Sequence, residues 1–186
     1  MDLKKSNKVA IVTGNGHGIG LAISEILRKE GYIVPVIDKP EYDLMQDGIQ
    51  KLMNDYPECE ILVNNVGGMG RSKQEDWKDC MQKNYGIAFE LTMYYIPKMK
   101  NGKVITISSI CALDNSGLPW FNAAKSAQIS LNKSLVGKYD ATFNTICPDK
   151  VNVKPEEAYK LNPEDIAIEV YKLINSNRNN EVIEIR

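Results

Sequence analysis

The sequence predicts an α/β protein with a doubly wound parallel sheet of the Rossmann type and about six strands. The first observation behind this prediction is a strand, a tight turn and a helix near the start of the chain. There the apolar run 9–12 meets four glycines between residues 14 and 20, and helical spacing continues over 21–28. The second is the alternation of apolar β-branched runs with helical segments over the rest of the chain, which is typical of a parallel sheet covered on both faces.

The glycine-rich turn has the composition of a phosphate-binding loop. Glycines let the backbone turn sharply and approach a pyrophosphate closely, and the free N–H groups of the following helix attract an anion. Asp38 closes the next apolar run, about 20 residues further on, where a carboxylate would accept hydrogen bonds from an adenosine ribose. We therefore expect a bound nucleotide, held by the loop residues Gly14, Asn15, Gly16, His17, Gly18, Ile19 and Gly20.

Length and composition indicate a single domain over residues 1–186. The chain is 43% hydrophobic and carries a formal net charge of −1. These values exclude a disordered chain and give no general attraction to nucleic acid or to a membrane surface. No apolar run approaches the roughly 20 residues that span a bilayer. The polar start lacks the apolar core of a signal peptide, so a cytoplasmic location is expected.

Cysteine and histidine usage argues against a metal centre. The four cysteines lie far apart in no metal-ligand pattern, and His17 is the only histidine, which excludes a histidine cluster or a Ser-His-Asp triad. Cys111 and Cys147 follow strand ends that face the expected site, and we expect both to be buried, inert thiols. No metal is predicted.

The second apolar run, 32–38, predicts a strand at or next to one edge of the sheet. Pro35 removes a ladder donor, and such a residue suits an edge strand. Only four residues separate Asp38 from Asp43, too few for a helix and a further full strand. The second crossover helix and the third strand are therefore expected to be reduced or missing.

The remaining elements alternate regularly to the end of the chain. Polar residues follow two of the strands, and a proline in the first turn is typical of the last helix. The expected elements are helix Asp47–Met53 continuing toward Tyr56, strand Ile61–Val63, long helix Glu75–Ile96, strand Val104–Ser109, helix Trp120–Leu135, strand Thr142–Cys147, a helix opened by Asn162 and strand Val182–Ile185.

Six motifs in this order resemble the short-chain dehydrogenase/reductase family over nearly the whole chain. The resemblance implies a Rossmann domain that binds NAD(P) and an oxidoreductase acting on a carbonyl or alcohol, with the nicotinamide carrying the hydride. The motifs are Thr13-Gly14-x-x-x-Gly18-Ile19-Gly20, Asn64-Asn65-Val66-Gly67, Asn84 in Lys83-Asn84-Tyr85-Gly86, Ile107-Ser108-Ser109, Lys125 and the Pro148 region.

The same resemblance assigns catalytic positions and exposes one departure. In the family a tyrosine gives or takes the substrate proton, and a lysine one helical turn later binds the nicotinamide ribose and lowers the tyrosine pKa. Lys125 matches this lysine, Ser109 the serine that polarises the carbonyl, and Asn84 the asparagine that supports a water relay. The tyrosine position holds Phe121, which has no exchangeable proton. Loss of a general acid or base typically costs about 10²–10⁴ in rate.

For the cofactor, the resemblance assigns Asp43 and Leu44 to the adenine and Asn64, Asn65, Gly67 and Pro148 to the rest of the binding site. A carboxylate at Asp38 repels a 2′-phosphate, so NAD is expected in preference to NADP. The segment that usually forms the substrate lid is shortened to roughly residues 154–161. A short lid suits an open site or a large substrate, including one carried by another protein.

Three functions remain open from the sequence. One is an oxidoreductase whose acid comes from Tyr85, Tyr42, Asp114, a thiol or a water bound by Ser109. Another is a nucleotide-binding pseudoenzyme that acts as a redox sensor or a partner subunit, and a third is a lyase or epimerase step on the same scaffold. Exposed sheet edges and apolar helix faces predict a homo-oligomer, with residues 75–96 and 120–135 as the candidate interface.

Overall fold

The computed structural model describes residues 8–68, 76–154 and 158–186. Its strands form one parallel sheet in the order β1-β2-β3-β4-β5, which confirms the predicted fold class. The strands are β1 (Ala10–Val12), β2 (Ile61–Asn64), β3 (Gly102–Ile107), β4 (Ala141–Pro148) and β5 (Val182–Ile185).

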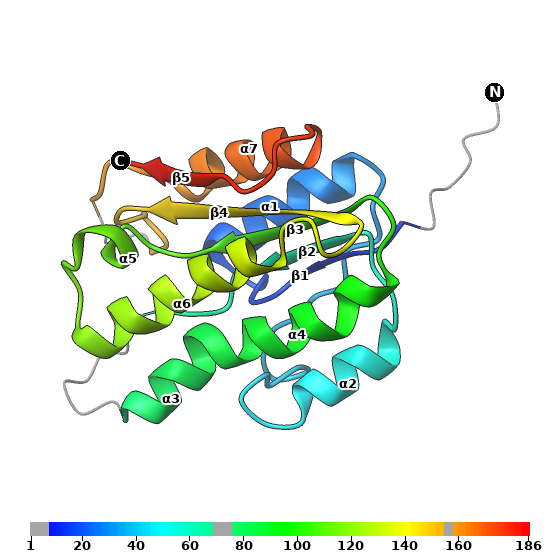
Figure 1. The fold of residues 1–186 in the computed structure, drawn as a ribbon, viewed down its shortest axis with the longest axis horizontal. Helices are drawn as coiled ribbons and strands as arrows, with labels where there is room; N and C mark the ends of the chain where they lie inside the picture. Colours follow the sequence, from blue (N-terminus) through cyan, green and yellow to red (C-terminus); the bar gives the residue numbers. More distant parts are fainter. Residues whose placement is uncertain (1–7, 69–75, 155–157) are drawn as a thin grey trace.

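Helices cover both faces of the sheet (Figure 1). One face carries α1 and α7, which pack against each other, and the other carries α2, α4 and α6. Their bounds are α1 (Gly18–Lys29), α2 (Gly48–Asp55), α4 (Ile87–Tyr95), α6 (Pro119–Leu135) and α7 (Pro163–Ile174), joined by the short helices α3 (Trp77–Met81) and α5 (Cys111–Asp114).

The long helix expected over 75–96 contains a local change of winding. Residue 75 lies outside the described residues, and the path from α3 into α4 passes through a π-helical turn, Gln82–Gly86. A 3₁₀ turn, Ile96–Lys98, then ends the helix at Pro97, which cannot donate to the ladder. A π turn inserts one extra residue, and such turns occur frequently at functional sites.

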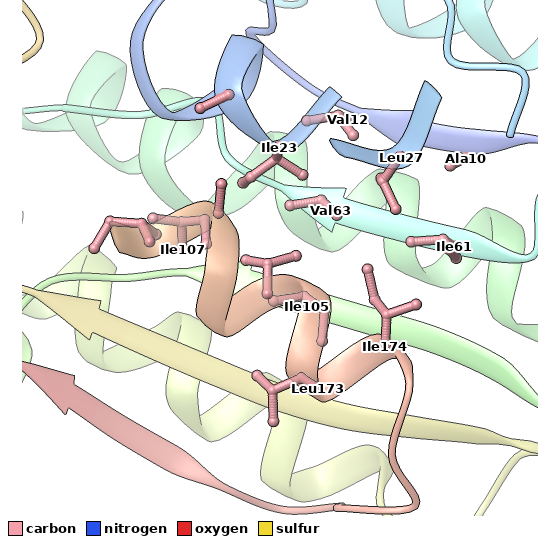
Figure 2. Close-up of a cluster of buried hydrophobic side chains, with 14 of the residues drawn as sticks. Ala10, Val12, Ile23, Leu27, Ile61, Val63, Ile105, Ile107, Leu173 and Ile174 are labelled. Atoms are coloured by element: carbon pink, nitrogen blue, oxygen red, sulfur yellow. The ribbon is translucent and has the colours of Figure 1, made fainter. Parts of the chain in front are cut away.

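Strand alternation divides the apolar side chains between two cores. Along β2, Ile61 and Val63 face one side and Leu62 the other. Figure 2 shows the first core, where Ile23 of α1 and Leu173 of α7 lie over the sheet. Both sides of β2 are buried, as is typical of a strand inside a parallel sheet.

The segment 32–38 lies beside β1 at the edge of the sheet, as predicted, but it is not a regular strand. It pairs with the β1 side only through two isolated bridges, Val9–Ile33 and Thr13–Ile37. Pro35 lacks the N–H that a ladder needs, and the Asn15 side chain takes over the pairing. Its Nδ2 donates to the Pro35 carbonyl at 2.7 Å, and its Oδ1 accepts from the Ile37 N–H at 2.7 Å.

No crossover helix or third strand follows this edge segment. The fully described stretch 39–47 consists of turns and leads directly into α2. The predicted reduction is thus confirmed, and the segment 32–38 is left as the edge of the molecule's sheet. Ile33 and Val36 are accordingly exposed.

Replacement of Asn15 by alanine should lower the free energy of unfolding by about 1–3 kcal/mol, because it leaves buried backbone groups of the edge segment without their partners. Urea denaturation measures the change. Asn54→Ala on the exposed surface of α2 is the control, and its effect should stay within about 0.5 kcal/mol. Equal effects of the two substitutions would contradict a structural role for the Asn15 amide.

Candidate functional site

The strand order reverses next to β1, and the candidate site lies at this point. From β1 the chain passes to the edge segment on one side and then returns to β2 on the other. In open α/β sheets, ligands bind in the crevice outside the carboxyl ends of strands at such a switch. A cavity of about 460 Å³ is found here. Its lining includes the predicted residues Gly14, His17, Gly18, Ile19, Asp38, Asp43, Leu44, Asn65 and Gly67.

The glycine-rich turn presents backbone rather than side chains to this cavity. Gly14 and Gly18 have φ angles of +66° and +54°, in the left-handed region that favours glycine. Gly20 packs against the Gly14 carbonyl and leaves no room for a side chain. His17 precedes α1 but forms no side-chain capping bond, so the first N–H groups of the helix remain available to an anion.

The Asp38 carboxylate is fixed at the rim of the first cavity. Its Oδ2 accepts from the Gly16 N–H at 2.9 Å, and a side-chain carbon on Gly16 would lie only 2.6 Å from this oxygen. The Nδ1 of His17 is 3.5 Å away. The neighbouring Lys39 ammonium pairs instead with Asp43 at 2.9 Å, and this hydrogen bond lowers the pKa of the Asp43 carboxyl.

Three asparagines near this cavity differ in their roles. Asn65 lines the cavity and donates to the carbonyls of Thr13 and Gly14 at 2.8 and 3.2 Å. Asn15 and Asn64 are buried and lie outside its lining. The Asn64 amide donates to Thr92 on α4 at 2.8 Å, so in this structure it joins β2 to the helix layer.

A second cavity of about 580 Å³ continues from the first toward α6. The two share the lining residues Ile19, Gly67 and Val153, so they form one cleft along the carboxyl edge of the sheet. The second cavity contains four further predicted positions, whereas Asn15, Gly16, Gly20, Asn64 and Asn84 lie outside the lining of both cavities. The lining of the second cavity includes Ser109, Phe121, Lys125 and Pro148, together with Cys111, Asp149 and Lys150.

Lys125 is a buried amine at the wall of the second cavity. Its Nζ donates to the Ile107 carbonyl at the end of β3, at 3.0 Å. The ring of Phe121, one helical turn earlier on α6, has its centroid 5.8 Å from this nitrogen. Burial lowers the pKa of Lys125 to about 8, because the charged form loses its hydration.

Asn84 meets Lys125 across Gly67. It lies in the π turn, where its Oδ1 accepts from the Gly68 N–H at 2.8 Å and its Nδ2 donates to the Cys80 carbonyl at 3.0 Å. A side-chain carbon on Gly67 would lie 2.6 Å from Asn84 Oδ1 and 3.0 Å from Lys125 Nζ. The π turn therefore places the Asn84 amide next to the lysine, against the backbone that joins the two cavities.

The two serines after β3 have separate functions. Ser108 is buried and donates to the backbone carbonyl of Lys125 at 2.9 Å, which fixes α6 against the sheet. Ser109 is only partly buried and lines the second cavity, where its Oγ accepts from the Cys111 N–H at 3.2 Å. Ser109 is thus the hydroxyl that can reach a ligand and still donate its proton.

The structure gives different positions to the alternative proton donors named in the sequence analysis. Tyr42 lines the first cavity and donates to Asp55, whereas Tyr85 packs on Phe89 and lies outside the lining of both cavities. Asp114 also lies outside this lining and accepts from a backbone N–H of its own turn.

Of the two cysteines expected to be buried, only one is. Cys147 is buried, and burial raises its pKa to about 11. Cys111 is half-buried and lines the second cavity, with its Sγ 3.4 Å from Ser116 Oγ. The expectation for Cys111 was wrong because α5 is a single short turn at the rim of the cleft, with no buried residue.

The stretch 149–153 also belongs to the cleft; the resemblance to the family places Val153 near the nicotinamide, whereas sequence reasoning did not assign Lys150. Asp149, Lys150 and Val153 line the second cavity. Their position directly after the β4 strand was the available signal, because the carboxyl ends of parallel strands share one edge.

Two further classes of site are absent from the described part of the chain. There, no group of three or more histidine, cysteine, aspartate or glutamate side chains is placed to hold a metal ion. Nor is any helix among these residues long and apolar enough to cross a membrane.

The fold and the glycine-lined cleft define a dinucleotide-binding α/β domain of the Rossmann type. A family model described as short chain dehydrogenase matches residues 38–162. The chain belongs to this family of oxidoreductases, and use of a nicotinamide dinucleotide follows from that membership.

Curated proteins and solved structures agree with the assignment. The chain is 28% identical over 176 residues to the 3-oxoacyl-[acyl-carrier-protein] reductase FabG of Escherichia coli, covering 76% of this chain and 72% of the reductase. It is 29% identical over 184 residues to the uncharacterized oxidoreductase YvaG of Bacillus subtilis, and the match covers 80% of this chain and 70% of YvaG. The structure of the acetoin dehydrogenase YohF from Salmonella typhimurium has the same fold, with a TM-score of 0.81 and 21% sequence identity. The match covers 96% of this chain and 94% of the YohF chain.

Replacement of Gly67 by alanine should lower the free energy of unfolding by about 1–3 kcal/mol more than the same change at Gly68, because the new carbon would collide with Asn84 and Lys125. A carbon on Gly68 meets nothing within 4 Å, and both glycines have positive φ, so backbone strain is common to the two variants. Thermal or urea unfolding measures the difference. Equal destabilisation would show that the close approach at Gly67 is not a packing constraint.

Proposed function

We propose that the protein is an NAD-dependent oxidoreductase in which the first cavity holds the adenosine half of the cofactor and the second holds the nicotinamide half together with a carbonyl or alcohol substrate. The observation that carries this proposal is the continuous cleft from Asp38 to Lys125, with the glycine-rich turn between them. Its backbone-lined floor suits a pyrophosphate, because there is no side chain at the glycines to keep the phosphates away.

Each part of the cleft offers groups suited to one part of the cofactor. Asp38 would accept from the adenosine ribose, with Asp43 and Leu44 near the adenine. The loop N–H groups and Asn65 would face the pyrophosphate side, and Lys125 would donate to the nicotinamide ribose. Gly67 lines both cavities, and Pro148 lines the second. Once bound, the cofactor supplies or accepts a hydride.

The remaining residues would orient a carbonyl substrate and stabilise the negative charge that develops on its oxygen. The Ser109 hydroxyl can donate to a carbonyl oxygen, and the Lys125 ammonium adds a positive charge in a buried site where electrostatic effects are large. The Asn84 amide fixes the backbone at Gly68 and so the shape of the cavity. Phe121 preserves an aromatic wall but supplies no proton, which predicts slow turnover on simple carbonyls.

Asp38 should make the protein bind NAD(H) at least about tenfold more tightly than NADP(H), because its carboxylate would face the 2′-phosphate. Calorimetry with both cofactors measures the ratio. Asp38→Asn removes the charge but keeps an oxygen that can accept from the Gly16 N–H. The difference between the affinities for NAD(H) and NADP(H) should therefore become smaller, while NAD(H) still binds. Tighter binding of NADP(H) by the unaltered protein would overturn this preference.

Replacement of Phe121 by tyrosine should raise reductase turnover by about 10²-fold or more, because it restores a proton donor one turn before Lys125. The nearby ammonium would lower the pKa of the new phenol. NADH oxidation over a carbonyl panel that includes a 3-oxoacyl thioester provides the measurement, with Phe121→Leu as the matched control. Brisk turnover by the unaltered protein would show that another group, such as Cys111 or a water on Ser109, is the acid.

The second candidate function is a nucleotide-binding protein without dehydrogenase turnover, a redox sensor or a partner subunit. The observation that favours it is again Phe121, since the cofactor half of the cleft is complete while the proton donor is absent. If the unaltered protein and the Phe121→Tyr variant both bind NAD(H) but neither oxidises it with any carbonyl in the panel, this second function is the better description.

We also propose a homo-oligomer with the α3–α4 and α6 surfaces at its interface, in the cytoplasm. Trp77 and Phe89 are large apolar side chains that are 58% and 40% exposed on this side of the molecule.

A carrier-bound carbonyl is a further candidate substrate, because the similarity to a 3-oxoacyl-[acyl-carrier-protein] reductase supports this substrate class.

A further inference from the structure

Lys125 combines near-complete burial with direct access to a cavity. Its residue is 4% exposed, yet it forms part of the wall of the 580 Å³ cavity. Its hydrogen bond goes to a neutral acceptor, the Ile107 carbonyl, at 3.0 Å. Within residues 8–68, 76–154 and 158–186, no carboxylate lies within ion-pair distance of this nitrogen.

This environment increases the fraction of the Lys125 amine that is neutral. A buried ammonium that lacks a carboxylate partner loses more hydration than it regains, and its pKa falls accordingly, here to about 8. The Phe121 ring, with its centroid 5.8 Å from this nitrogen, offers no oxygen that could accept a hydrogen bond from the lysine. A lysine desolvated in this way is the usual form of an amine nucleophile toward carbonyl groups.

We propose that the Lys125 amine captures small aldehydes reversibly as an imine inside the second cavity. This reactivity is separate from hydride transfer and goes beyond the proposed function. Small aldehydes are the ligand class that the geometry favours, because their unhindered carbonyl carbon can approach an amine recessed in the wall. The Ser109 hydroxyl lines the same cavity and can donate to the carbonyl oxygen.

The capture is a condensation that needs no oxidant or reductant. The Nζ lone pair forms a bond to the carbonyl carbon, and the carbonyl π electrons move to the oxygen, which takes up a proton. The nitrogen loses one proton, and the resulting carbinolamine expels water as the carbon–nitrogen double bond forms. Hydrolysis reverses each step, so the adduct becomes permanent only when an added hydride reagent reduces it.

The imine and the cofactor should compete, because the proposed function uses the same ammonium to hold the nicotinamide ribose. The two proposals can nevertheless be tested separately. Binding of NAD(H) is measured by calorimetry without aldehyde, and imine formation is measured without cofactor. Either property can therefore fail while the other is retained.

The test uses the full chain with benzaldehyde as the probe, trapped with borohydride and located by peptide mass spectrometry. At pH 7 we expect Lys125 to be labelled at least ~10-fold faster than Lys133, an exposed lysine on the same helix, because a lowered pKa increases the neutral fraction. The labelling rate should rise as the pH passes through about 8. NAD(H) should protect Lys125 and leave labelling of Lys133 unchanged.

Lys125→Met removes the amine while keeping a long apolar side chain, and the adduct should disappear from this variant. Lys133→Arg is the matched control and should retain it. If Lys125→Met does not fold, the peptide map of the unaltered protein still decides the question. Labelling spread over the surface lysines at similar rates, or absent from Lys125, would overturn the proposal. If bound NAD(H) does not protect Lys125 from labelling, imine formation is supported, but the proposed placement of the cofactor beside this lysine is overturned.

Discussion

The hydrogen bonds of the Asn15 side chain hold the glycine-rich turn against the edge segment 32–38, and the shape of the first cavity depends on them. They replace the strand ladder that Pro35 prevents. The same contact brings Asp38 to the Gly16 N–H and fixes its carboxylate at the rim. An edge that lacks its outer strand would otherwise leave this carboxylate on a loosely held segment.

The second half of the cleft depends on contacts between β3 and α6. Ser108, which follows β3, donates a hydrogen bond to the backbone carbonyl of Lys125 in α6. The Lys125 amine in turn donates to the carbonyl of Ile107 at the end of β3. The lysine amine is therefore held in a defined place, and no carboxylate of the described residues pairs with it. Phe121 is buried beside this lysine, and its ring has no group that can exchange a proton.

Much of the fold could be predicted because its signals are local. The apolar runs at 61–63, 104–107 and 142–147 became β2, β3 and β4, and the capping residues at Asn162 placed the start of α7. The missing third strand followed from simple chain length between Asp38 and Asp43. The site positions were less predictable: a strand-end asparagine such as Asn64 can face a ligand or a helix, and the sequence does not distinguish the two.

The sequence by itself determined the periodicity of each element, the glycine-rich turn and the phenylalanine at position 121, because these depend only on residue type and spacing. The tertiary structure alone decided which polar groups reach the cleft. It left Cys111 half-buried at a short helical turn, brought Asn84 close to Lys125 through a π turn, and buried the lysine away from the carboxylates of the described residues. These outcomes depend on how elements distant in sequence pack together, and burial sets the charge state of a group only once that packing exists.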